Sequence, residues 1–337
     1  MIRNIQLLLI IAFCFLLSPR AYAVFGASIS YECLGTNTYE VTLTAYQDCN
    51  ASPLPISGLN LDWMGACSPS SGIIGLTLVS QTDITPVCLS STSSCNGGTG
   101  GKGVEEYIYT GTFTLPAGCN VATVSWQYCC RNNAITTFNS TPAGLYVYAE
   151  INNGAGLCNN SVQFLNDPKI VGDRNDAYVY NNGAIDIDGD SLVYSLVDCQ
   201  ESMGTVVDYD IAAGYSGANP INAGPSISID TETGQIRFGI TPPPNQRAVI
   251  CILVEEYRGN IRVGAVVRDV QYESKSNSSN DVPVVSSINV LGSYSITGAV
   301  GTPLSFFVEG SDLNVTDSIT MDWDNAISGA TFTLTQG

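Results

Sequence analysis

The sequence predicts an all-β protein made of tandem Ig-like or cadherin-like β-sandwich domains that carry disulfides. Two observations lead to this prediction: apolar and polar residues alternate with a period of two in many short segments, and turn-forming clusters separate those segments. A third is the presence of 12 cysteines, a number typical of exported chains. No long segment has a helical period, so we expect strands throughout.

The N-terminus, residues 1–23, predicts a cleaved signal peptide. Arg3 is followed by an apolar run from Ile5 to Leu17, and Ala21 and Ala23 provide a small-x-small cleavage site. The run is shorter than the ~20 residues that span a bilayer, and no later stretch is apolar enough, so we expect no transmembrane segment in the mature chain. The predicted location is therefore secreted or at the cell surface.

The clearest predicted strand lies at 39–45, where every second residue from Tyr39 to Ala45 is apolar and the others are Glu or Thr. Similar alternation returns at 107–113, 124–128 and 261–265, and such strands between turn-rich loops are typical of sandwiches.

Cysteine density and turn-rich segments divide the chain. We expect a Cys-rich β domain at 24–156, an Ig-like or cadherin-like sandwich at 157–273 and a linker at 274–281. The segment 282–337 reads as a partial sandwich repeat, because its 56 residues fall short of the ~100 of a whole domain.

Eleven cysteines remain after residue 23, and an exported chain is expected to pair most of them. Zinc is disfavoured because the sequence has no histidine and no C-x-x-C pair. Cys199 and Cys251 are the only cysteines well inside the second unit, so we predict that they form a disulfide. Cys129 and Cys130 are adjacent, and on a strand they would face opposite ways and have different partners.

An acidic turn is the best candidate for a chemical site. Asp186, Asp188 and Asp190 alternate along the turn and could converge on one calcium ion. The turn is not an EF-hand loop, because its glycine, Gly189, is at the fourth position instead of the sixth, and Val197 stands at the twelfth position in place of Glu. The alternative is a solvated turn between strands, since Asp and Gly are common turn residues.

A second acidic segment repeats the first one, allowing one inserted residue. Asp312, Asn314 and Asp317 make a second, weaker calcium candidate. The recurrence also supports a tandem repeat of one β-domain.

Charge and missing residue types argue against several functions. Removing residues 1–23 takes away Arg3 and Arg20, so the net charge changes from −18 to −20, and we expect no nucleic-acid partner. Without histidine, Ser-His-Asp and Cys-His catalytic arrangements are excluded. In each of the carboxylate pairs 105–106 and 255–256, the two side chains face opposite ways on a strand, so neither pair can flank a single bond of a substrate. We therefore interpret them as charged strand edges and expect that the chain is not an enzyme.

Several motifs resemble the N-terminal region of large gliding-motility-associated or PKD-domain surface proteins of Bacteroidetes. They are SCNGGT at 94–99, VEEY at 104–107, CCRNNAI at 129–135, DIDGDSL at 186–192, GYS at 214–216, DTETG at 230–234 and VEEY at 254–257. The chain departs from the repeat at Ile187, where proline is common.

The resemblance implies a modular extracellular protein, often exported by type IX secretion, that acts in adhesion, surface structure or gliding motility. Its partners would be surface glycans or other cell-surface proteins. The alternative is a carbohydrate-binding or accessory module of a secreted degradative enzyme, in which Trp63, Trp126 and Trp323 would stack on sugars.

Overall fold

The computed structural model describes residues 24–85, 87, 92–99, 103–154, 157–168, 171–173, 178–221, 227–238, 245–275, 283–292, 296–299, 301–313, 319, 321, 331 and 333. Within them the chain is all-β and contains no α-helix. The predicted signal peptide and Trp323 lie outside these residues.

The long strands form the main sheet, and the short strands pair at its edges or in small sheets of two or three strands. They are β1 (Val24–Gly35), β2 (Thr38–Asp48), β3 (Ser57–Gly65), β4 (Ser71–Asp83), β5 (Val104–Thr114), β6 (Val121–Tyr128), β7 (Leu145–Asn152), β8 (Gln163–Phe164), β9 (Val171–Asp173), β10 (Tyr178–Asn181), β11 (Ala184–Ile185), β12 (Ser191–Val197), β13 (Gln200–Ser202), β14 (Thr205–Val206), β15 (Ile227–Ile229), β16 (Gln235–Phe238), β17 (Arg247–Arg258), β18 (Ile261–Lys275), β19 (Val284–Val285) and β20 (Gly310–Ser311). Short 3-10 turns are η1 (Ser94–Asn96), η3 (Ile211–Ala213) and η4 (Ile288–Val290).

The four strands predicted from alternation are present. Tyr39, Val41, Leu43 and Ala45 on β2 are all fully buried, whereas the residues between them are partly exposed. Tyr107 and Tyr109 on β5 and Trp126 on β6 are also buried. On β18 the alternation is absent: Ile261, which follows the hairpin turn, is 62% exposed, and every residue from Val263 to Ser274 is buried, on both faces of the strand.

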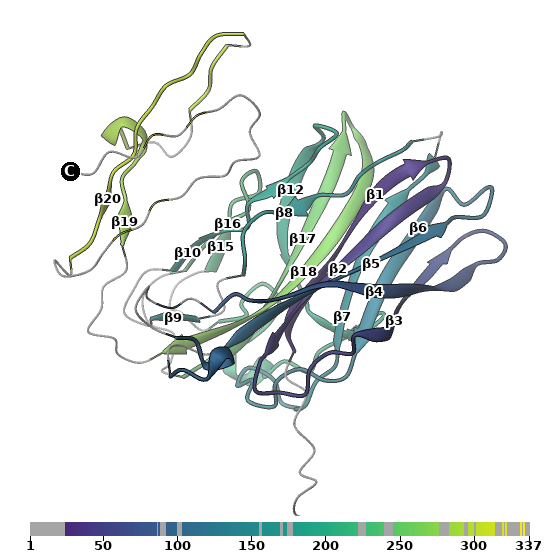
Figure 1. Ribbon diagram of the computed structural model, residues 1–337, viewed down its shortest axis with the longest axis horizontal. Helices are drawn as coiled ribbons and strands as arrows, with labels where there is room; N and C mark the ends of the chain where they lie inside the picture. The colour runs from purple at the N-terminus through teal and green to yellow at the C-terminus, as the bar shows by residue number, and fades with distance from the viewer. Residues whose placement is uncertain are drawn as a thin grey trace, which may run out of the picture.

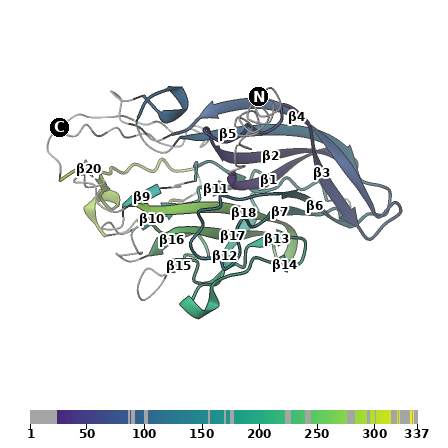
Figure 2. The ribbon, with the colours of Figure 1, turned by 90° about the horizontal axis from the view of Figure 1, so that it is seen from below.

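The main sheet closes on itself. Its strands pair in the order β18-β1-β2-β5-β4-β3-β6-β7, and β7 pairs again with β18, while β17 and β12 extend from β18. In Figure 2, β4, β5, β2 and β1 lie along one side, with β18, β7 and β6 next to them.

Two strands, β4 and β18, change partner along their length, and the sheet bends at these points to close. The first half of β4 pairs with β3 and the second half with β5, with a register shift between Leu78 and Ser80. β18 pairs with β7 at 264–266 and with β1 at 269–270. At that second crossing a side chain on Gly26 would collide with the carbonyl oxygen of Asp269, so only glycine fits there.

The predicted boundary between 156 and 157 does not separate two cores. Strand β18 from the second unit pairs with β17 from the same unit and also with β1 and β7 from the first (Figure 1). One apolar cluster also contains residues from both units, such as Tyr39 and Val254. The two units therefore share one sheet, a long-range pairing that local turn signals do not reveal.

The predicted linker at 274–281 also begins too early. Ser274 and Lys275 belong to β18, where they pair in parallel with β9, and Ser274 is fully buried. Residues 276–281 lie outside the described residues. After them, β19 and β20 form a two-stranded antiparallel sheet outside the main sheet, and Phe306 and Phe307, shortly before β20, are large exposed residues.

Candidate functional site

The predicted acidic turn connects β11 to β12. The backbone N–H of Gly189 donates to the carbonyl of Asp186, and the N–H of Asp190 donates to Oδ1 of Asp186 at 2.9 Å. Gly189 has a φ of +79°, a conformation that favours glycine. The turn brings one carboxylate oxygen each from Asp186, Asp188 and Asp190 within 4.8 Å of one another.

A guanidinium group from the end of β17 lies at this cluster. Arg258 donates from Nε to Oδ1 of Asp190 at 2.8 Å and from an Nη atom to Oδ2 of Asp190 at 2.7 Å. The same Nη atom lies 3.1 Å from Oδ2 of Asp188. The hydrogen bond to Asp190 raises the pKa of Arg258 well above its usual value. The residues around the turn therefore supply their own cation.

Two asparagines fix the other side of the cluster. Asn160 donates from its backbone N and from Nδ2 to the two oxygens of Asp188, both at 2.8 Å. Asn159 accepts from Arg258 at 2.9 Å. The segment that carries them follows Cys158, whose disulfide to Cys33 ties it to β1. Charge-assisted hydrogen bonds thus hold the turn to the 159–160 segment and to the end of β17, and the disulfide holds that segment to β1.

A fourth carboxyl group lies behind the turn and is fully buried. Glu256 accepts hydrogen bonds from the N–H of Val162 and from Nδ2 of Asn159. Burial, followed by the nearby charges of Asp186 and Asp190, raises its pKa to about 7 against the lowering effect of those hydrogen bonds. A side chain at Gly264 would collide with Glu256, so glycine makes room for it.

The structure corrects the interpretation of the 255–256 pair as charged strand edges. The two residues do face opposite ways, and Glu255 forms an ion pair with Arg262 at 2.7 Å. Glu256, however, lies on the buried face with Val254. The signal was present in the sequence, because Val254 and Glu256 have the same parity on one strand.

Asp186 is the aspartate of the turn that has no ion pair with Arg258. Burial is the main cause that raises the pKa of Asp186, and the charges of Asp190 and Asp188 add to it. Its Oδ2 is buried without a hydrogen-bond partner among the described residues. A divalent cation here would find up to three carboxylates, but calcium takes 6 to 8 oxygens and would compete with Arg258.

The second predicted calcium candidate is not assembled in the described residues. Asp312 directly follows β20, whereas Asn314 and Asp317 lie outside the described part of the chain.

The structure pairs Cys199 with Cys251, the pair expected from the sequence. Four more disulfides lie within the described residues, and they join Cys33 to Cys158, Cys49 to Cys95, Cys67 to Cys119 and Cys129 to Cys130. The expectation of different partners for Cys129 and Cys130 was wrong: β6 ends at Tyr128, so the side-chain alternation of a strand does not extend to them. Cys88, the eleventh cysteine, lies outside the described residues.

A buried ion pair, not expected from the sequence, joins the loop after β6 to β18. Arg131 lies in the CCRNNAI segment, and its two Nη atoms contact the two oxygens of Asp269 on β18 at 2.5 and 2.7 Å. Both side chains are at most 2% exposed. Arg131 also donates to the carbonyls of Gly144 and Gln200. An arginine beside two cysteines was the only local signal, and its partner is 138 residues away.

Comparison with known proteins adds no relative: no protein-family model, curated protein or solved structure matches this chain. Within the described residues, no helix has the length and hydropathy needed to span a bilayer. The disulfides fit an extracellular protein, because such bonds persist in oxidising compartments.

Proposed function

We propose that this chain is a non-catalytic extracellular or cell-surface protein that acts in adhesion, surface structure or gliding motility. The observation that carries the proposal is the pairing of all ten described cysteines in disulfides within an all-β fold. Such cross-links stabilise small β-structures outside the cell by restricting the unfolded chain. The signal-like N-terminus and the CCRNNAI resemblance support the same assignment.

Labelling of intact cells of the source organism tests this proposal. An antibody against the chain should label unpermeabilised cells, and deletion of its reading frame should reduce attachment or spreading on a surface. Labelling that requires permeabilisation, or a deletion strain that attaches and spreads normally, would overturn it. A periplasmic protein and a cytoplasmic protein labelled in parallel provide the controls.

The tandem Ig-like or cadherin-like arrangement stays a prediction. The carbohydrate-binding alternative does not gain support from the tryptophans, because Trp63 is 7% and Trp126 is 3% exposed and both pack in the core. Sugar binding would therefore need another surface.

Calcium at Asp186, Asp188 and Asp190 is a further part of the proposal, and Arg258 makes it testable. Thermal unfolding with millimolar calcium and with chelator should show a calcium-dependent rise in Tm that Asp188→Ala abolishes. Arg258→Gln should enlarge the rise, since calcium would no longer compete with the guanidinium.

Two results would contradict the calcium proposal. Superimposed curves in every variant would make the aspartates a structural turn. A shift that occurs only in Arg258→Gln would identify Arg258 as the natural cation of the cluster.

A further inference from the structure

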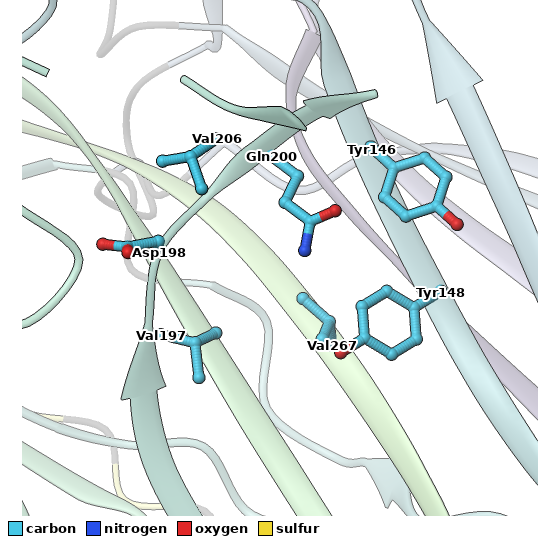
Figure 3. Close-up of a pocket in the computed structure, with 7 residues that line it drawn as sticks. All are labelled: Tyr146, Tyr148, Val197, Asp198, Gln200, Val206 and Val267. Carbon is cyan, nitrogen blue, oxygen red and sulfur yellow. The ribbon is translucent and has the colours of Figure 1, made fainter. Parts of the chain in front are cut away.

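A pocket of about 310 Å³ lies where β7 changes partner. Tyr146 of β7 pairs with Gln200 of β13, and three residues later Ala149 pairs with Val266 of β18. The pocket opens where these two partners diverge (Figure 3). Its lining consists of Tyr146, Tyr148, Val197, Asp198, Gln200, Val206 and Val267.

The wall of the pocket is cross-linked to the sheet. Cys199 lies between Asp198 and Gln200, and its disulfide ties this wall to Cys251 on β17. Arg131, held by Asp269, donates to the carbonyl of Gln200 at 3.1 Å. A wall fixed in this way loses little conformational entropy when a ligand binds.

The lining combines an apolar surface with one directed donor. The rings of Tyr146 and Tyr148 lie 6.0 Å apart, and Val267 lies beside Tyr148 (Figure 3). Oε1 of Gln200 accepts from the N–H of Gly204 at 2.9 Å, which orients the amide. Figure 3 shows the amide nitrogen directed toward the space between Val197, Val267 and Tyr148.

Charge narrows the class of ligand. No Lys or Arg lines the pocket, Asp198 lies at its exposed rim, and the chain carries a net charge of −18. Anionic ligands are therefore disfavoured. A purely apolar group, such as a leucine side chain of a peptide, would leave the Gln200 amide without an acceptor, and a buried unpaired donor is costly.

We propose that this pocket binds one neutral pyranose ring of a glycan. The apolar face of the ring would pack on Tyr148 and Val267, and a ring hydroxyl would accept from Nε2 of Gln200. The volume is at the lower end of the ~300–1,000 Å³ of small-molecule pockets, which suits a single ring. The inference goes beyond the surface role proposed above and does not depend on it.

Saturation-transfer NMR on the oxidised full chain tests the pocket. The probes are the methyl glycosides of glucose, galactose, mannose, fucose and N-acetylglucosamine, with N-acetyl-leucine amide as the apolar competitor. At least one glycoside should receive saturation. Tyr148→Ala and Gln200→Glu should each weaken its binding at least tenfold, because they remove the apolar surface and the donor. Phe306→Ala, which removes an exposed aromatic ring outside the pocket, should not change it.

Gln200→Glu keeps the side-chain shape and an acceptor for Gly204, so it remains informative if Tyr148→Ala folds poorly. Three results would overturn the proposal: no saturation of any glycoside, binding that survives both pocket variants, or saturation of N-acetyl-leucine amide alone. None of them changes the outcome of the cell-labelling experiment, and absence of surface label would leave sugar binding intact. The two proposals can therefore fail separately.

Discussion

Glu256 illustrates how a single buried residue can set the pH dependence of the fold. Its pKa is about 7 in the folded protein and near 4.5 in an unfolded chain, so the folded state holds the proton more tightly. Its contribution to stability is therefore fully present below about pH 4.5 and is lost as the pH rises through about 7, a difference of roughly 3 kcal/mol at most.

We expect Glu256→Gln to flatten this dependence. Urea unfolding at pH 5 and pH 8 should show that the wild-type chain loses more free energy of unfolding on going to pH 8 than the variant does. The two proteins are compared by their change between pH 5 and pH 8, and not by their stability at one pH, because glutamine has one side-chain oxygen and cannot accept from both Val162 and Asn159. Glu255→Gln, on the exposed face, is the matched control. Equal pH dependence in Glu256→Gln and wild type would refute the assignment.

At the level of single residues, the sequence predicted side chains that follow strand parity and missed those with distant partners. Tyr39 and Leu43 were placed inward because their neighbours are polar. The three aspartates were expected together because a turn makes their proximity local. Arg258 gave no such signal, because its partners lie 68 and 70 residues earlier in the chain.

At the level of elements, Arg131 links the loop after β6 to β13 and β18. We expect Arg131→Met to cost about 3–5 kcal/mol of unfolding free energy, because Asp269 would remain buried without its counter-charge. Burial already raises the pKa of Asp269 against the effect of Arg131. The double variant with Asp269→Leu should be less destabilised than Arg131→Met alone. Urea denaturation at pH 7 measures both.

The control is Arg247→Met, whose pair with Glu273 is 3.0 Å long and partly exposed. That substitution should cost about 1 kcal/mol or less. Equal losses from Arg131→Met and Arg247→Met would contradict a special role for the buried pair.

The existence of the strands was predictable from alternation. Which strands a residue such as Arg131 joins was not predictable, since this depends on contacts between residues far apart in sequence.

At the level of the whole molecule, the closed sheet explains why cysteine density misplaced the domain boundary. Eight of the cysteines after residue 23 precede 157, so the first part looked self-contained. In the fold, however, β1 and β7 both depend on β18 for part of their pairing. The Cys33–Cys158 disulfide also crosses the expected boundary. Turn-rich segments mark loops equally well within a domain and between domains.

This closure predicts that residues 24–156 do not fold alone, whereas residues 24–275 unfold in one cooperative step. Without β17 and β18, the shorter fragment would expose strand edges on β1 and β7 and part of the shared core, which contains Val254 and Tyr272. Both fragments should be produced under oxidising conditions and compared by amide NMR and thermal melting. We expect dispersed signals and a single transition, detected alike by tryptophan fluorescence and circular dichroism, only for 24–275. A well-dispersed spectrum and a cooperative melt for 24–156 would restore the two-domain division, because that fragment would then possess a core of its own.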